Sequence, residues 1–112
     1  MDIRQVTDDY AVSGQIATDD IQAIKDAGYR SIICNRPDDE QPGQPSAADI
    51  ATAAEAADLV FRHIPFVSGQ MTEDDVQKMV EALDEIPGPV FAYCRSGARS
   101  TNIYMAAKQA KG

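Results

Sequence analysis

The chain has 112 residues, of which 44% are hydrophobic, and it carries a formal net charge of −8. This composition predicts a single domain over residues 1–112 and excludes the basic surface that nucleic-acid binding needs. The acidic balance also disfavours an anionic membrane, and no apolar stretch approaches the roughly 20 residues of a membrane span.

The start of the chain and its cysteine count indicate a reducing compartment. The first residues, MDIRQVTDD, lack the basic start and apolar core of a secretory signal. Two cysteines, Cys34 and Cys94, are too few for a disulfide framework. We therefore expect a cytoplasmic protein in which a free thiol is available for chemistry.

The first third of the chain predicts a strand or hairpin, a helix and a buried strand. Apolar residues within the first dozen positions suggest the strand or hairpin. Thr18 is placed to cap the helix, which buries Ile21 and Ile24 and ends at Gly28. Residues 31–35, SIICN, form the predicted buried strand.

A proline-rich loop and a second helix follow. Residues 36–46, RPDDEQPGQPS, hold three prolines and a glycine, which indicates a loop at the end of a strand. Ser46 and Asp49 form a helix-start pattern. Residues 59–64 are a further strand candidate. The buried face of the second helix is predicted to carry Ile50, Ala53, Ala54 and Ala57.

The last part of the chain predicts a helix, a strand and a terminal helix. Thr72 and Asp75 repeat the capping pattern, and Pro-Gly-Pro at 87–89 ends the helix that they begin. Residues 90–93 form a strand that leads into Cys94. The first helix is predicted to be amphipathic from Val76, Met79, Val80 and Leu83, and the terminal helix is suggested by Ile103, Ala106, Ala107 and Ala110.

This alternation of strands and helices predicts an α/β domain of three layers, in which helices flank a mostly parallel central sheet. Ligand sites in such sheets lie beyond the carboxyl ends of the strands. We therefore expect Cys94 and the loops at 36–46 and 65–71 to gather at one edge.

The segment YCRSGARS, residues 93–100, combines three features that favour anion binding. A helix N-terminus presents free N–H groups, and Gly97 allows the positive φ that makes successive N–H groups converge. Arg95 and Arg99 add two guanidinium groups. Such surroundings lower a thiol pKa from about 8.5 to roughly 3.5–7.5, so Cys94 is predicted to be a thiolate nucleophile.

This segment resembles the active loops of cysteine phosphatases and rhodaneses. Over nearly its whole length the chain is similar to the phosphatase-like domain of the beta-lactamase hydrolase-like family, also described as a sulfur transferase family. The segments that carry the resemblance are YAVSGQ, SIICNRPDDEQPGQPS, FRHIPFVSGQMTEDDV and YCRSGARS. It implies a fold like that of dual-specificity and tyrosine phosphatases, and a possible partner enzyme of the metallo-beta-lactamase-like class.

Two departures from the phosphatase pattern bear on the reaction. Cysteine phosphatases place five residues between cysteine and arginine, whereas four separate Cys94 from Arg99, as in rhodanese loops. Ser68 stands where dual-specificity phosphatases carry an Asp that protonates the leaving oxygen. The acids that could substitute for it are Asp38, Asp39, Asp74 and Asp75, and the spacing selects none of them.

Four other residues near the predicted edge have a functional and a structural interpretation. Ser100 occupies the place of a hydroxyl that bonds the thiolate in phosphatases, or is a plain polar residue of the first helical turn. Arg36 is expected to pair at the surface with an acid of residues 38–40 rather than to serve the site. Cys34 is expected to be inert packing rather than a partner for an oxidised Cys94. His63 is expected to be a structural hydrogen-bonding residue, and no metal-ligand cluster is apparent.

The residues therefore predict a cysteine-thiolate enzyme with Cys94 and Arg99 as catalytic residues and no cofactor. Its substrate is a small oxyanion or a sulfur compound. The preferred hypothesis is sulfane-sulfur transfer through a Cys94 persulfide, and the alternatives are phosphoester hydrolysis through a phosphocysteine and a non-catalytic binding module. The residues predicted to bind substrate are Arg95, Ser96, Gly97, Ala98 and Ser100.

Overall fold

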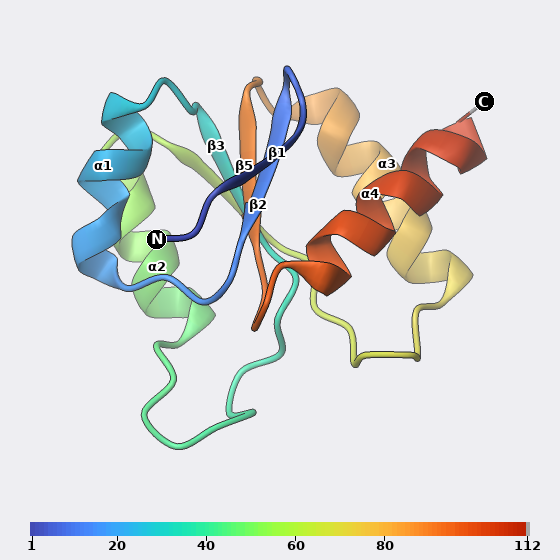
Figure 1. Ribbon diagram of the computed structural model, residues 1–112, viewed down its shortest axis with the longest axis horizontal. Coiled ribbons are helices and arrows are strands. Elements are labelled where there is room, and N and C mark those ends of the chain that lie inside the picture. The colour runs from blue at the N-terminus through green and yellow to red at the C-terminus, as the bar shows by residue number, and fades with distance from the viewer. Residues whose placement is uncertain (112) are drawn as a thin grey trace.

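The computed structural model describes residues 1–111, which form a three-layer α/β arrangement around one sheet (Figure 1). The five strands lie in the order β1-β2-β5-β3-β4. Strands β1 and β2 are antiparallel, and all other pairs are parallel. The mostly parallel sheet predicted from the sequence is confirmed. The strands are β1 Arg4–Thr7, β2 Tyr10–Ser13, β3 Ser31–Cys34, β4 Val60–His63 and β5 Val90–Tyr93.

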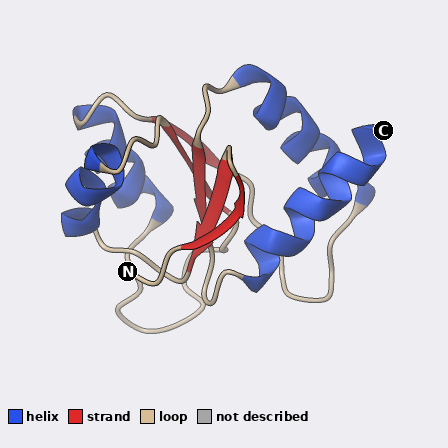
Figure 2. Ribbon diagram, turned by 45° about the horizontal axis from the view of Figure 1, so that its top comes forward, coloured by secondary structure: helices blue, strands red, loops and turns tan. Residues whose placement is uncertain are grey.

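Helices cover both faces of the sheet. Figure 2 shows α1 and α2 on one side of the strands and α3 and α4 on the other. No helix in the described part of the chain is long and apolar enough to cross a membrane. The helices are a short 3-10 helix Thr18–Asp20, α1 Ile21–Asp26, α2 Ala47–Ala56, α3 Glu73–Glu85 and α4 Ala98–Lys111.

The central strand β5 is buried on both faces, which explains its uninterrupted apolar sequence. Phe91 and Tyr93 pack in the core cluster beneath α1 and α2. Val90 and Ala92 pack in the second cluster, beneath α3 and α4. Because consecutive side chains of a strand point to opposite faces, this one strand joins both halves of the core.

Two helix starts agree with their predicted caps. The Ser46 hydroxyl accepts the N–H of Asp49 at 3.1 Å at the start of α2. The Thr72 hydroxyl accepts the N–H of Asp75 at 3.1 Å, and the Asp75 carboxylate accepts the N–H of Thr72 at 2.9 Å. The second pair is a reciprocal capping box, which needs no long-range contact and is therefore readable from sequence.

The predicted cap at Thr18 is wrong. The chain enters α1 through a 3-10 turn that begins at Thr18, so the residue before the turn, Ala17, occupies the cap position. The Asp20 carboxylate accepts the Ala17 N–H at 2.8 Å. An acid inside the turn reaches back to the cap backbone, and this removes the need for a capping hydroxyl.

The predicted terminal helix is present as α4, but not all of the apolar residues that suggested it face the core. Ile103 and Ala107 are buried, whereas Ala110 is exposed and Ala106 is half-buried. Tyr104 is buried instead, because its ring stacks on that of Tyr10 with 3.9 Å between centroids. A large aromatic side chain gains more from burial than alanine does, so it sets the rotation of the helix.

The loops after β2, β3, β4 and β5 all leave from the carboxyl edge of the parallel strands. Figure 1 shows this edge below the sheet, where the loop of residues 35–46 and the loop of residues 64–72 extend beside the start of α4. The Phe66 carbonyl accepts a hydrogen bond from Arg99, and Glu40 pairs with the same guanidinium. The predicted gathering of these segments at one edge is confirmed.

Candidate active site

The loop from Cys94 to Gly97 joins β5 directly to α4, so Cys94 lies at the end of the central strand. The Gly97 N–H donates to the Cys94 sulfur at 3.0 Å. Gly97 has a φ of 95°, a backbone conformation that L side chains rarely adopt, and this allows its N–H to turn toward the sulfur. Because α4 begins at Ala98, the sulfur also lies at the positive end of a helix.

The surroundings of Cys94 lower the pKa of its thiol. Burial raises this pKa, but the N–H groups of Ser100, Ser96 and Gly97 and the Ser100 hydroxyl together outweigh burial. Ser100 Oγ is buried and has no hydrogen bond of ordinary geometry within residues 1–111. Tyr10 anchors the same residue, because its hydroxyl donates to the Ser100 carbonyl at 2.8 Å. The site therefore favours a thiolate.

Residues from the start of the chain support the outer side of the loop. The Arg4 guanidinium donates to the Ser96 carbonyl, and the Gln15 N–H donates to the Arg95 carbonyl at 3.4 Å. At Gly14, a Cβ atom would lie 2.9 Å from that carbonyl oxygen, so the loop can approach only a glycine there. Sequence reasoning missed these contacts because they join segments 80 to 92 residues apart.

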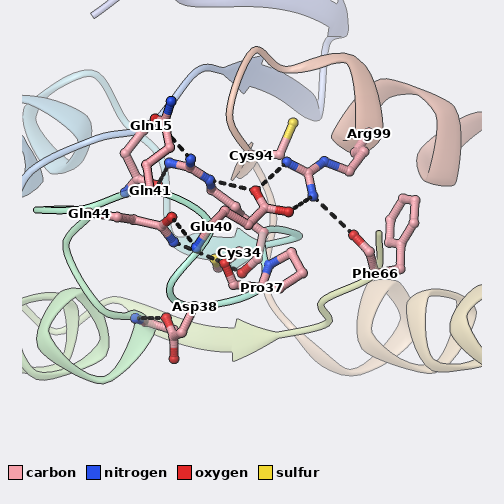
Figure 3. A network of polar contacts seen from close by, with 12 residues as sticks. Gln15, Cys34, Pro37, Asp38, Glu40, Gln41, Gln44, Phe66, Cys94 and Arg99 are labelled. Carbon is pink, nitrogen blue, oxygen red and sulfur yellow. Dashed lines mark hydrogen bonds and ion pairs between the residues drawn. The ribbon is translucent and has the colours of Figure 1, made fainter. Parts of the chain in front are cut away.

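Arg99 is held by Glu40, as Figure 3 shows. Its NH1 and NH2 groups donate to the two carboxylate oxygens at 2.7 and 2.8 Å, and NH1 also donates to the Phe66 carbonyl at 3.1 Å. Both NH1 hydrogens are therefore used. The Nε–H and the second NH2 hydrogen form no hydrogen bond to an oxygen within residues 1–111, and together they can bind an oxyanion.

Glu40 is shared between two arginines. Arg36 Nε donates to it at 2.8 Å. Hydrogen bonding from Arg99 is the largest cause that lowers the pKa of Glu40, to about 2, and Arg36 adds to it. The same pair raises the pKa of Arg99. Two guanidinium groups and one carboxylate leave a net positive charge beside the thiolate.

The prediction for Arg36 was half wrong. Its partner is Glu40, one of the three expected acids, but the side chain is only 2% exposed rather than at the surface. NH1 and NH2 of Arg36 donate to the side-chain oxygens of Gln15 and Gln41 at 3.0 and 3.2 Å. A buried cation needs such a complete set of acceptors, and Arg36 finds them in three different side chains.

A cavity of about 540 Å³ opens beside this loop. Its lining residues are Glu40, Val67, Ser68, Arg95, Ser96, Ala98 and Arg99. Four of the predicted site residues thus face one space, while Gly97 and Ser100 are buried and contact the sulfur instead. Cys94 is buried beneath the loop. The cavity therefore borders the loop that covers the thiol, and this loop can bind an oxyanion there.

The site and the fold match a known family. A family model of the phosphatase-like domain of the beta-lactamase hydrolase-like protein matches residues 2–111. The chain belongs to this family. The beta-lactamase hydrolase-like proteins of Xylella fastidiosa (strain Temecula1) and Agrobacterium fabrum (strain C58) are 36% and 34% identical to it over 93% and 90% of the chain. The chain spans about a quarter of their length, 24% and 23%.

Solved structures share the phosphatase-like fold. The phosphatase candidate nma1982 from Neisseria meningitidis Z2491 has a TM-score of 0.86 and 31% identity, over 96% of this chain and 77% of that one. Tk-PTP in its active form has a TM-score of 0.65 at 13% identity, over 85% of this chain and 63% of that one, which shows the fold alone. The predicted dual-specificity or tyrosine-phosphatase-like fold is thereby confirmed.

In this phosphatase-like domain, Cys34 and His63 lie behind the site rather than in it. Cys34 faces the α1/α2 cluster beside Tyr93, its partner across β3 and β5, and burial raises the pKa of its thiol. His63 Nε2 lies 2.9 Å from the Arg36 carbonyl oxygen, the same atom that the Cys34 thiol contacts at 3.4 Å. Both side chains thus brace the backbone beneath Arg36.

Proposed function

We propose that the domain hydrolyses phosphate esters through a phosphocysteine on Cys94. The observation that carries this proposal is the juxtaposition of a thiol of lowered pKa with converging loop N–H groups and with Arg99, whose Nε/NH2 edge forms no hydrogen bond to an oxygen of the described residues. Membership of a phosphatase-like family supports it. Two sequence features do not support phosphate-ester hydrolysis: the four-residue spacing between Cys94 and Arg99, and Ser68 in place of an acid. They motivate the second candidate below.

The first step is attack of the Cys94 thiolate on phosphorus. The S–P bond forms while the P–O bond to the leaving group breaks, and its electron pair departs with the leaving oxygen. The loop N–H groups and the Nε/NH2 edge of Arg99 bind the phosphoryl oxygens during this transfer. In the second step water attacks phosphorus, the S–P bond breaks, and phosphate and the thiolate are released.

An aryl phosphate assay tests the proposal. We expect the wild type to release the phenol and to yield a phosphocysteine at residue 94 by mass spectrometry after acid quenching. Cys94→Ser should lose this turnover, whereas Cys34→Ser, the matched change at the other cysteine, should keep it. Undiminished turnover in Cys94→Ser would refute every covalent mechanism at this loop.

Sulfane-sulfur transfer is the second candidate, and the four-residue spacing from Cys94 to Arg99 favours it. Here the thiolate attacks the outer sulfur of thiosulfate, the S–S bond breaks, and sulfite leaves with the electron pair. An acceptor thiolate then attacks the terminal sulfur of the persulfide and releases Cys94. A persulfide at residue 94 after incubation with thiosulfate, together with no aryl phosphatase activity, would favour this reaction over hydrolysis.

A further inference from the structure

The cavity beside the loop of Cys94 to Ser100 lacks a carboxyl group that is free to donate a proton at neutral pH. Ser68, at the position where related folds carry an acid, lines this cavity with a hydroxyl group. Among the described residues that line it, Glu40 is the single carboxylate. The hydroxyls of Ser68 and Ser96 are too weakly acidic to protonate a leaving oxygen, and the guanidinium groups of arginine keep their protons at neutral pH. Glu40 is therefore the one carboxyl to consider among these lining residues.

Glu40 is the counter-ion of two arginines and is not free to donate a proton. Its two oxygens accept three hydrogen bonds from Arg36 and Arg99, at 2.7 to 2.8 Å. A proton on this carboxyl would compete with those bonds and leave two guanidinium groups without their shared anion. The pKa of Glu40 is lowered to about 2 for the same reason, because both arginines favour the ionised carboxylate. Glu40 is thus a fixed anion and not an acid.

The other acids proposed from sequence lie outside the cavity lining, and three of them have structural roles. The Asp38 carboxylate accepts the Ala47 N–H at 2.8 Å and so helps to start α2. Asp75 caps α3, and Asp74 forms an ion pair with Lys78 at 3.2 Å. Neither these three nor Asp39 is among the residues that line the cavity. None of the described residues that line the cavity therefore takes over the task of the missing acid.

We propose that this domain acts on donors whose leaving group departs as a stable anion without receiving a proton, such as acyl phosphates, phosphoanhydrides and acidic aryl phosphates, and that it discriminates against alkyl phosphates. The proposal rests on the phosphatase function above and narrows its substrate class. The electron pair of the breaking P–O bond stays on the leaving oxygen, and solvent protonates that oxygen afterwards where its basicity requires.

The size of the discrimination follows from acid strengths. A carboxylate leaving group has a conjugate acid of pKa about 4 and a phenolate about 10. An alkoxide is about as basic as hydroxide, since water has a pKa of about 15.7. A positioned general acid contributes about 100- to 10,000-fold, mostly to the basic leaving groups. Without it, the rate should follow leaving-group basicity. The sulfur-transfer candidate obeys the same limit, because sulfite leaves as an anion.

The test is a series of aryl phosphates whose phenols span pKa values from about 4 to about 10, with an alkyl phosphate at the end. The assays contain a chelator, so that no metal ion assists the leaving group. We expect kcat/KM to fall steeply, approaching about tenfold for each unit of phenol pKa, and the alkyl phosphate not to be turned over measurably.

If kcat/KM varied by no more than about tenfold over the whole series, the inference about leaving groups would be overturned and the proposed function would stand. A change of about tenfold is what we expect for a single unit of phenol pKa. No Cys94-dependent turnover of any member would overturn both. These two results are distinguishable, because the first needs active enzyme and the second does not.

A gain-of-function variant tests the position of the missing acid. Ser68→Asp places a carboxyl at the cavity wall, and it should raise kcat/KM for the most basic leaving groups by about 100-fold while changing the most acidic ones little. Ser68→Asn matches it in size but has no acid proton, so it should show no such gain. Ser68 lies in an exposed loop, and both variants should fold. An equal change for all substrates in Ser68→Asp, or an unchanged slope, would refute the assignment.

Discussion

Glu40→Gln tests how the loop arginine is held in place. The change keeps the size of the side chain but removes the charge that Arg99 and Arg36 share. Gln offers one oxygen where Glu40 offers two, so at least one of the two bonds to Arg99 is lost. Arg36 keeps its bonds to Gln15 and Gln41 but loses its counter-ion inside the protein.

The expected loss of stability follows from the pKa of Glu40, which is lowered from 4.5 to about 2. At about 1.4 kcal/mol per unit, this gives an upper limit of about 3.4 kcal/mol. The Glu40 side chain is 25% exposed and solvent screens the pair, so we expect roughly 1–2 kcal/mol at pH 7. For a domain of this size, this corresponds to a decrease in Tm of about 4–8 °C.

The stabilisation by the Glu40 ion pairs should depend on pH, and its direction follows from the lowered pKa of Glu40. Because the pKa of Glu40 is lower in the folded than in the unfolded chain, its ion pairs stabilise the fold fully above about pH 4.5 and lose effect as the pH falls toward 2. The difference in Tm between wild type and Glu40→Gln should therefore shrink over this interval. Glu81→Gln is the matched control, since Glu81 is exposed on α3.

Glu40→Gln should lower both kcat and KM. Without Glu40, the free edge of Arg99 is no longer held toward the loop, and a misplacement of about 1 Å costs about 100-fold in kcat. The same change removes a negative charge from the cavity wall, so KM for an anionic substrate should fall. Steady-state kinetics on the most acidic aryl phosphate measures both. An unchanged kcat, or a Tm shift no larger than that of Glu81→Gln, would refute the positioning role.

Three further predictions concern the loop itself. Ser100→Ala should raise the pKa of the Cys94 thiol, because the hydroxyl helps to lower it; the pH dependence of iodoacetamide alkylation measures this, and an unmoved profile would contradict it. Gly97→Ala should destabilise the domain by about 1–3 kcal/mol and abolish turnover, because its φ of 95° strains an L residue and its Cβ would meet the Arg4 guanidinium. Cys34→Ala should leave the alkylation profile of Cys94 in place, and a shifted profile would show that the two thiols are coupled.

The features that sequence reasoning predicted correctly are local. The strand–loop–helix order around Cys94 follows from an apolar run, a glycine and a helical pattern that are contiguous in the chain. The caps at Ser46 and Thr72 each involve a residue three positions away. The shared edge follows from the rule that parallel strands end on the same side.

The features that it missed depend on contacts between distant segments. Glu40 and Arg99 lie 59 positions apart, and the same loop holds two other acids, Asp38 and Asp39. Only the packed fold shows which acid reaches the guanidinium. The burial of Arg36 has the same origin, because its acceptors come from Gln15, Glu40 and Gln41. In α4, the choice between Tyr104 and Ala110 as a core residue depended on the position of Tyr10.

The position of Glu40 and the absence of an acid are physically linked. A carboxylate that accepts from two guanidinium groups is held ionised, so the one carboxylate among the described residues that line the cavity serves to position a cation. Fixing Arg99 stabilises the charge on the transferred group, whereas a protonated carboxyl would stabilise the leaving oxygen. One side chain cannot do both at neutral pH. A site built this way therefore depends on the intrinsic stability of the leaving anion, whether that anion carries oxygen or sulfur.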